Sequence, residues 1–367
     1  MRLGVSAALV GDALVPGDVL VADGLVQAVG VAPAGAGGIA LAGFVDLQVN
    51  GFGGVDFLTA GGEEIACAEV ALAATGVTAY QPTLISAPEA ELARALAVLG
   101  AVPAVAPGAR RLGAHLEGPF LSPRWPGAHP REHLRAPDGA LVARLLAGGP
   151  VAMVTLAPEL PGGLELVRSL SARGVIVSIG HSDADTATVH AAFDAGARGL
   201  THVHNAHRRF APREPGPAGV ALIRPGVGVM AILDGVHLAP ETAAAAWLTA
   251  RERLCLVTDA IAAAGTTHEG PTHLGRCAVT VAEGAARLAD GTLAGGLGTM
   301  DRALRELMAL GATLAQAGHA AARAPALLAG RPELGQIAPG APADLVVVDE
   351  GLRVRRTVVA GREAFAG

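Results

Sequence analysis

Eight apolar, strand-like runs follow one another between residues 43 and 260, and several are followed by alanine- and leucine-rich segments of helix-forming composition, such as 88–99 and 184–195. Apolar strands that alternate with helical segments indicate βα units and a parallel sheet. Eight such units can close into a (β/α)8 barrel of the TIM type, so the sequence predicts an α/β fold of this class. The predicted strands are 43–49, 77–83, 111–117, 151–157, 175–181, 199–205, 227–233 and 254–260.

Short strand-like stretches separated by turn residues occupy both ends of the chain. We expect residues 1–42 and 335–367 to meet in a small β-sandwich domain, and residues 43–334 to form the barrel. Residues 274–296 predict a β-excursion after the last barrel strand, with a turn at Asp290–Gly291. The helices expected after this excursion span residues 300–310 and 314–328.

Polar residues lie at the ends of the predicted strands, at positions where a strand buried in a hydrophobic core usually carries apolar residues. In a (β/α)8 barrel the carboxyl ends of all strands meet at one mouth, where active sites are built. Five separate strand ends that finish in metal-ligating or acid–base side chains are hard to explain by packing alone. The sequence therefore predicts a site at this mouth. Its candidate side chains are Gln48, Asn50, Glu117, His181, His202 and Asp259, with Asp234 and His237 following the seventh strand.

Three of these side chains form a plausible metal-binding set. Glu117, His181 and His202 offer one carboxylate and two imidazoles from three strand ends. Zinc and similar ions accept such ligands, and a catalytic ion keeps one position open for a water whose pKa it lowers to about 7. Asp259 could take a proton from that water and pass it to a leaving group. The set predicts a metal-dependent hydrolase, and no G-x-S-x-G pattern supports a serine triad.

Composition limits the classes of function that the site can serve. The chain has 367 residues and a formal net charge of −6, which argues against a nucleic-acid binder because such proteins need a basic face. The longest charge-free run, residues 24–45, is rich in glycine, so we expect no membrane helix. The N-terminus has one arginine and a short apolar stretch interrupted by Asp12, so we expect no signal peptide. Three scattered cysteines suit a reducing environment, so we expect a cytoplasmic protein.

Seven short motifs lie in the order and approximate spacing found in one enzyme family. They are HLEGPFLSPRWPGAH, GHSDA, THVHNA, REPG, LDGVH, LVTDA and GTLAGG. From residue 43 to about residue 300 the chain resembles the N-acetylglucosamine-6-phosphate deacetylases of the amidohydrolase superfamily, and GQIAPGAPADLVVVD resembles the usual tail of that superfamily. The resemblance implies a barrel with a small β-domain made from both chain ends. It also implies hydrolysis of the acetamido group of N-acetylglucosamine 6-phosphate, giving glucosamine 6-phosphate and acetate in amino-sugar catabolism.

The resemblance carries catalytic roles over to individual residues. It assigns Glu117, His181 and His202 to one divalent metal, with zinc favoured and iron, cobalt or manganese as alternatives. Asp259 matches the catalytic acid/base. His237 matches a residue that contacts the substrate near its carbonyl.

The resemblance also implies residues that bind a phosphorylated amino sugar. His129, with Ala128 beside it, matches a substrate-contacting position. Arg213 matches a phosphate-binding arginine that reaches in from the partner subunit, so we expect a homodimer; an arginine fork suits a phosphate dianion. We expect Arg208 and Arg209 to lie on a solvated loop. The remaining matches are Asn205 and Ala206 to a pair that contacts the sugar phosphate, and Leu293, Ala294 and Gly295 to a loop that lines the sugar pocket.

The first predicted strand indicates how many metal ions the site holds. Two-metal amidohydrolases end this strand in H-x-H, whereas Gln48 and Asn50 stand there in this chain and in many of the resembling deacetylases. The chain also contains no lysine: all 27 basic residues are arginines. The absence of lysine excludes the amidohydrolase subtype in which a carboxylated lysine bridges two metals. We therefore expect a mononuclear site, with Gln48 and Asn50 shaping the pocket or hydrogen-bonding to water.

Two other functions stay open at this point. A deacetylase for N-acetylgalactosamine 6-phosphate or for an N-acylated amino acid would use the same centre. A non-catalytic barrel that serves as a scaffold is the alternative of a different class, and the retained ligand set with Asp259 counts against it. The segments LSPRWPGAH and GTLAGGLGTM depart from what many relatives carry, which affects sugar recognition more than the reaction. His204 and His207 are expected in the pocket wall or behind the ligands, and His115 behind Glu117 or in the core.

Overall fold

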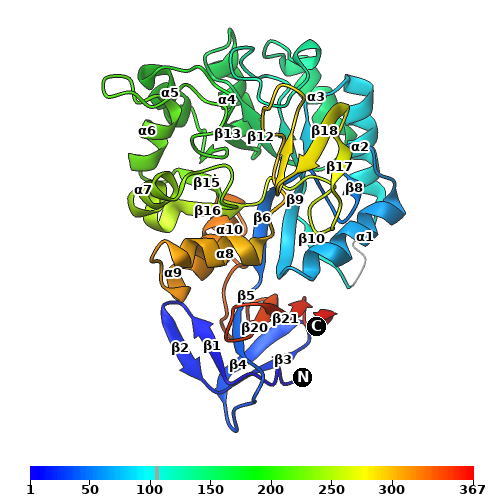
Figure 1. Ribbon diagram of the computed structural model, residues 1–367, viewed down its shortest axis with the longest axis vertical. Helices are drawn as coiled ribbons and strands as arrows, with labels where there is room; N and C mark the ends of the chain where they lie inside the picture. The colour runs from blue at the N-terminus through cyan, green and yellow to red at the C-terminus, as the bar shows by residue number, and fades with distance from the viewer. Residues whose placement is uncertain (104–106) are drawn as a thin grey trace.

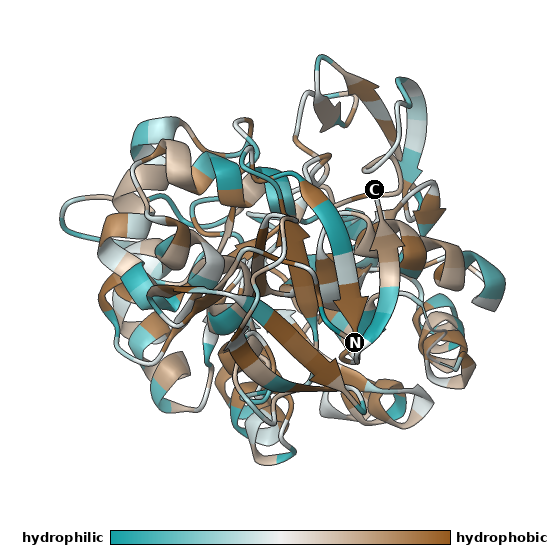
Figure 2. Ribbon diagram, turned by 90° about the horizontal axis from the view of Figure 1, so that it is seen from below, coloured by the Kyte–Doolittle hydropathy of each residue, from teal (hydrophilic) through white to brown (hydrophobic). Residues whose placement is uncertain are grey.

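A parallel barrel forms the body of the protein in the computed structural model, which describes residues 1–103 and 107–367. Each strand pairs with the next one along the chain, as predicted, and the fold class is confirmed. Apolar residues predominate on the barrel strands, whereas the helices carry apolar and hydrophilic residues side by side (Figure 2). The barrel strands are β6 (Phe44–Val49), β9 (Val77–Ile85), β10 with β11 (Arg110–Arg111 and Ala114–Glu117), β12 (Val151–Leu156), β13 (Ile176–Ile179), β14 (Gly199–Leu200), β15 (Gly228–Ile232) and β16 (Leu254–Val257).

The barrel closes between β6 and β16 through a side chain. Here an isolated bridge joins Val49 of β6 to Ala260, three residues beyond the end of β16, and the N–H groups of Asn50 and Gly51 also donate to Ala260 O. Below it, Oδ1 of the fully buried Asp46 accepts from the backbone N–H groups of Gln48 and Thr258, both at 3.2 Å, and Oδ2 accepts from Thr258 Oγ1 at 2.6 Å. The Asp46 carboxylate therefore joins the first strand to the last one where ladder bonds are missing.

Helices cover the outside of the barrel and pack on it through one apolar face (Figure 1). In α4, for example, Leu166, Val167 and Leu170 are buried at helical spacing. Aspartates begin two of the helices, since Asp138 accepts from Ala140 N and Leu141 N and Asp185 accepts from Thr188 N. The covering helices are α1 (Gly62–Ala73), α2 (Glu89–Ala101), α3 (Gly139–Gly148), α4 (Gly163–Ala172), α5 (Thr186–Asp194), α6 (Gly216–Ile223), α7 (Pro240–Ala250) and α8 (Met300–Ala309), with short 3₁₀ turns η1 (Arg131–His133) and η2 (Arg251–Arg253).

The last helical region differs from the single helix expected over residues 314–328. It comprises α9 (Leu314–Gly318), a π-helical turn η3 (His319–Arg323) and α10 (Ala324–Leu328). Pro325 has no N–H to give to the preceding turn, and a wider turn accommodates that missing donor. Accordingly, the backbone N–H of Ala324 reaches back five residues to His319 O.

The two chain ends meet in a small β-region that lies at the bottom of Figure 1 and contains both termini. Residues Leu345–Val348 pair antiparallel with Ile39–Ala42, which brings strands from opposite ends of the sequence side by side. A separate apolar cluster that includes Val5, Val19 and Val358 lies in this region. The boundaries at residues 42 and 335 stay predictions. The strands are β1 (Ala7–Val10), β2 (Ala13–Pro16), β5 (Ile39–Ala42), β20 (Leu345–Val348), β21 (Val354–Val359) and β22 (Arg362–Ala366) in one sheet, and β3 (Asp18–Ala22) with β4 (Leu25–Val31) in a second.

The predicted β-excursion after β16 is present. Its turn forms at Asp290, whose Oδ1 accepts from Thr292 N at 2.9 Å, and the returning chain bridges Leu293 to Arg287. This places Leu293 over the barrel mouth. No helix in the two described ranges is long and apolar enough to cross a membrane. The excursion strands are β17 (Gly270–Leu274), β18 (Cys277–Ala282) and β19 (Ala285–Arg287), and a smaller hairpin after β6 comprises β7 (Gly51–Phe52) and β8 (Val55–Asp56).

Candidate metal centre and substrate cavity

Three of the predicted site residues lie just beyond strand ends in a left-handed backbone conformation. The φ angles are 48° at His181, 28° at His202 and 49° at Asp259. Residues other than glycine rarely adopt such angles, at a cost of roughly 1–3 kcal/mol each, and they do so mainly at functional sites. The packed barrel holds this strain, and the reversal of the backbone brings all three side chains to the centre of the mouth.

Glu117, His181 and His202 converge on one point. Glu117 Oε1 lies 3.2 Å from His181 Nε2 and 2.9 Å from His202 Nε2, and the two Nε2 atoms are 3.2 Å apart. All three residues are buried, with at most 4% of each exposed. Three potential electron-pair donors packed this closely repel one another unless a cation or a proton sits between them.

The far ring nitrogens of the two histidines fix which tautomer each ring adopts. His181 Nδ1 faces the carbonyl oxygen of Trp125 at 2.9 Å, and His202 Nδ1 faces that of Asn205 at 3.1 Å. A carbonyl only accepts, so each Nδ1 carries the proton and each Nε2 can present a lone pair toward Glu117. Such an outer hydrogen bond is the usual arrangement of a metal-bound histidine.

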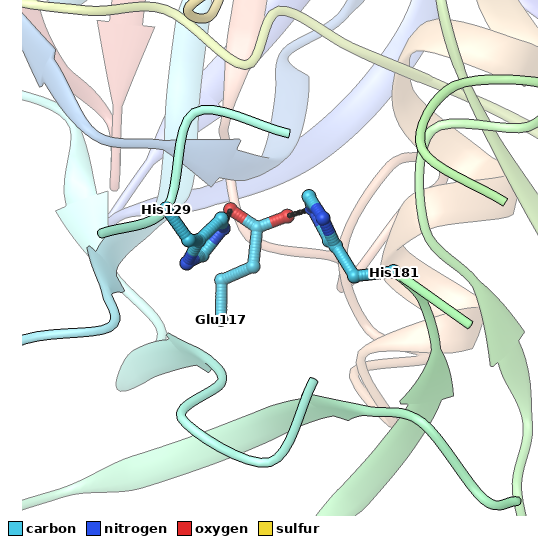
Figure 3. Close-up of side chains that lie close together, drawn as sticks. All are labelled: Glu117, His129 and His181. Atoms are coloured by element: carbon cyan, nitrogen blue, oxygen red, sulfur yellow. Dashed lines mark hydrogen bonds and ion pairs between the residues drawn. The ribbon is translucent and has the colours of Figure 1, made fainter. Parts of the chain in front are cut away.

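His129 lies on the other side of Glu117 and has the opposite arrangement. The ligand atoms of Glu117, His129 and His181 lie within 4.8 Å of one another, and Figure 3 shows His129 and His181 facing different oxygens of the carboxylate. However, His129 Nδ1 accepts from the backbone N–H of Ser86 at 3.2 Å, so the ring proton belongs on Nε2. That Nε2–H points at Glu117 Oε2, 3.5 Å away. His129 is therefore arranged as a hydrogen-bond donor rather than as a ligand.

The protonation of this cluster agrees with a cation site. Burial raises the pKa of Glu117, but its close contacts with His129, His181 and His202 outweigh this effect and hold that pKa well below its ordinary value. Burial also lowers the pKa of His181 to about 4. For His202 burial acts in the same direction, but the Glu117 carboxylate outweighs it and raises the pKa. The cluster thus favours one positive charge between Glu117 and His202, which a metal can replace with release of a proton.

Asp259 and the two amides at the end of β6 form the adjoining part of the site. Asn50 Nδ2 donates to Asp259 Oδ1 at 2.7 Å, and Gln48 Nε2 donates to Glu117 Oε1 at 2.9 Å. Burial and the charge of Glu117 raise the pKa of Asp259 to about 6, which suits a group that must accept and return a proton near neutral pH. The two amides thus each orient one carboxylate.

His237 is held by a carboxylate that sequence reasoning did not assign to it. Burial raises the pKa of Asp234, but hydrogen bonds and charge from His237 together with two backbone N–H groups outweigh it and bring that pKa to about 2. Asp234 Oδ2 faces His237 Nδ1 at 2.8 Å, which leaves His237 Nε2 as the free ring nitrogen of a residue that lines the cavity. The i, i+3 spacing within LDGVH is the signal that could have revealed the pair.

A cavity of about 680 Å³ connects these groups with the solvent. Trp125, Arg209 and Arg287 in its lining were not among the predicted site residues. Most of the predicted site residues line the cavity, whereas Gln48 and Ala294 are fully buried behind it, and Arg213 is exposed and lies outside its lining. The predicted residues that line it are Asn50, Glu117, Ala128, His129, His181, His202, Asn205, Ala206, His237, Asp259, Leu293 and Gly295.

The structure also locates the other histidines near the mouth and the two neighbouring arginines, Arg208 and Arg209. His115 is a buried core residue, held by Leu47 O and Thr155 Oγ1. His207 is buried behind His202 and bonds Thr201 O, whereas the half-buried His204 lines a smaller cavity next to the main one. Arg208 lies on a loop with 33% of its side chain exposed, and it also pairs with Asp183 at 3.3 Å.

Residues 39–364 match the amidohydrolase family. The chain is a member of this family. The amidohydrolase is 38% identical over 341 residues to the N-acetylglucosamine-6-phosphate deacetylase of Bos taurus, covering 89% of this chain and 83% of that protein. It is 36% identical over 326 residues to the N-acetylgalactosamine-6-phosphate deacetylase of Escherichia coli O157:H7, covering 88% and 86%.

Solved structures give the same grouping. A mutant N-acetyl-D-glucosamine-6-phosphate deacetylase from Mycobacterium smegmatis, in complex with N-acetyl-D-glucosamine-6-phosphate, matches this amidohydrolase with a TM-score of 0.93 and 36% identity, covering 100% of this chain and 99% of that one. The resemblance inferred from the seven motifs is confirmed. Family membership also implies a divalent metal, for which the converging carboxylate and imidazoles supply suitable ligand atoms.

Proposed function

We propose that this amidohydrolase removes the acetyl group of N-acetylglucosamine 6-phosphate, giving glucosamine 6-phosphate and acetate. The observation that carries the proposal is the convergence of Glu117 Oε1, His181 Nε2 and His202 Nε2 within 3.2 Å of one another, beside a buried aspartate of raised pKa. Both deacetylase relatives and the structural neighbour act on, or bind, a phosphorylated acetamido sugar.

Glu117, His181 and His202 would hold one divalent ion, for which we favour zinc. A bound ion of this kind polarises a carbonyl and lowers the pKa of an attacking water to about 7. Gln48 and Asn50 offer neutral amides, which are weaker ligands than the two imidazoles of a two-metal site, and this supports a single ion. The hydrogen-bond partners of the two Nδ1 atoms support His202 rather than His129 as the third ligand.

Residues of the chain itself then carry out the proton transfers and position the substrate. Asp259, ionised above a pH of about 6, accepts the proton of the attacking water and returns it to the leaving nitrogen. His237, with its Nδ1 fixed by Asp234, directs Nε2 toward the bound acyl group. The Nε2–H of His129 is 3.5 Å from Glu117 Oε2, a long contact from which it can turn to donate to a sugar hydroxyl in the cavity.

The sugar and its phosphate would extend toward the outer part of the cavity. Asn205 and Ala206 lie at its wall and Leu293 and Gly295 cover it, consistent with contacts to the phosphate and to the ring. Arg213 is exposed on the same chain and would act in a homodimer by reaching into the partner's cavity.

N-acetylgalactosamine 6-phosphate is the second candidate substrate, because the relative from Escherichia coli O157:H7 carries that name at 36% identity. Acetate release from both phosphorylated epimers and from unphosphorylated N-acetylglucosamine tests the proposal. We expect the zinc-loaded protein to process a phosphorylated sugar far faster than the unphosphorylated one. Equal rates on the phosphorylated and unphosphorylated forms would contradict phosphate recognition, and no acetate from any of them would contradict the deacetylase function.

A further inference from the structure

A smaller cavity of about 350 Å³ adjoins the substrate cavity. The two share Trp125, Asn205, Ala206 and Arg209 in their linings, so the smaller one is an annex of the larger. Residues 204–210, in the segment between β14 and α6, form most of the annex wall. Four of these seven residues are histidine or arginine, and the two arginines, Arg208 and Arg209, supply the positive charge of the annex wall.

The backbone of the annex wall has the shape of an anion-binding concavity. The φ angles at His202, His204 and Ala206 are 28°, 70° and 49°, and the intervening residues have ordinary negative values. Alternating left-handed and ordinary residues can gather N–H groups around an anion. The N–H groups of Val203 and Asn205 bond Met230 O and His202 O, so those of His204 and Ala206 are the donors that remain. The N–H groups of His204 and Ala206 have no hydrogen-bond acceptor within residues 1–103 and 107–367.

The two neighbouring arginines of the wall play different parts. Arg208 is tied down because its Nη2 pairs with Asp183 Oδ2 at 3.3 Å, and the same aspartate accepts from Trp125 Nε1 at 2.8 Å. This network fixes the indole and Arg208 as rigid walls. Arg209 is exposed, forms no ion pair or hydrogen bond within the part of the chain that the structure describes, and lines both cavities.

We propose that Arg209, from the same chain, adds a phosphate contact to those that the resemblance assigns to Asn205 and Ala206, with the main-chain N–H group of His204 as a further donor. The inference rests on the proposed function and adds to it a phosphate ligand that needs no second subunit. A guanidinium fork and free backbone donors are the groups that a phosphate dianion prefers. Arg213, which lies outside the lining of the main cavity, would supplement this contact rather than supply all of it.

The test compares Arg209→Ala, Arg209→Lys and the matched surface control Arg173→Ala in the metal-loaded enzyme. We expect Arg209→Ala to raise the KM for the phosphorylated sugar about tenfold or more, with kcat changed much less, because a charged hydrogen bond is lost. The ratio of kcat/KM for phosphorylated over unphosphorylated sugar should fall in parallel. Arg209→Lys should recover part of the loss, and the exposed Arg173→Ala should match the wild type.

An unchanged KM in Arg209→Ala, or an equal loss on both sugars, overturns the assignment. Calorimetry of inorganic phosphate binding to the wild type and to Arg209→Ala measures the affinity of the annex for phosphate without any turnover. Weaker phosphate binding by the variant supports the inference even if the preferred sugar differs, and equal binding overturns it. Failure of the wild type to release acetate from any phosphorylated sugar would instead reject the proposed function.

Discussion

The deep end and the outer end of the substrate cavity are built differently. At the deep end each reactive group is buried and has a named partner: Gln48 for Glu117, Trp125 O for His181, and Asn50 for Asp259. At the outer end Arg209 and Arg213 are exposed. Preorganised, water-poor surroundings strengthen electrostatic catalysis, so the deep end is shaped before substrate arrives.

Substitution of the histidines is the most stringent test of this description of the deep end. We expect His202→Gln to lose tightly bound metal and essentially all activity, because the variant removes one of three ligands. His129→Gln should keep one metal per chain while activity falls, because its Nε2 carries a proton and does not ligate. Metal content per chain, measured by elemental analysis after dialysis, separates the two.

The assignment fails if both variants lose metal equally, since the distances alone allow either histidine as a ligand. Two tightly bound ions per wild-type chain would contradict the single-metal interpretation of Gln48 and Asn50. Removal of the metal with a chelator should abolish activity, and zinc should restore it.

The next largest effect is expected at Asp259. Asp259→Asn removes the proton acceptor while keeping the side-chain shape, so turnover should fall by about 10²–10⁴-fold. Metal content should stay near the wild-type value, because Asp259 is outside the ligand set. In the wild type, kcat should decrease as the pH falls through about 6 or below, where Asp259 becomes protonated. Unchanged turnover in Asp259→Asn would remove this residue from the mechanism.

The two ends of the cavity also differ in how far the sequence could predict them. The deep end was predictable because each of its residues follows an apolar run, and a barrel brings such positions together whatever the loop geometry. The outer end depends on loop conformation. Neither Trp125 nor Arg209 could be placed from periodicity, because the contact with Asp183 and the left-handed backbone at residues 204 and 206 are tertiary features.

The same distinction applies to the fold. All eight barrel strands were predicted, yet the strand expected over 199–205 is reduced to Gly199–Leu200, because the chain turns left-handed at His202 to present its side chain. The helix expected over 314–328 is interrupted by a π-helical turn before Pro325. Departures of this kind come from local backbone demands that hydrophobic periodicity does not report.

At the outer end, Arg213→Ala should produce a smaller and more selective change. If Arg213 reaches into the partner's cavity, its loss should raise the KM for the phosphorylated sugar several-fold, with little effect on kcat. Steady-state kinetics over a range of enzyme concentrations measures this effect and its dependence on dimerisation. An unaltered KM would refute the assignment and leave phosphate recognition to residues of the same chain.

The smallest expected effect concerns the closure of the barrel beneath the deep end. Burial raises the pKa of Asp46 from 3.8 to about 7, so between these values the folded state binds a proton that the unfolded state has released. Stability must then fall as the pH rises from about 4 to about 7. Asp46→Asn has no such proton, so its stability should depend less on pH, by on the order of 4 kcal/mol across this window.

Urea unfolding of the metal-loaded protein at several pH values between 5 and 8 measures the difference. The exposed Asp12→Asn should keep the wild-type pH dependence. Parallel pH profiles for Asp46→Asn and the wild type would show that Asp46 is ionised in the folded protein throughout. The seam between β6 and β16 would then be held by a charged hydrogen-bond acceptor, and the deep end of the cavity would rest on a permanent negative charge.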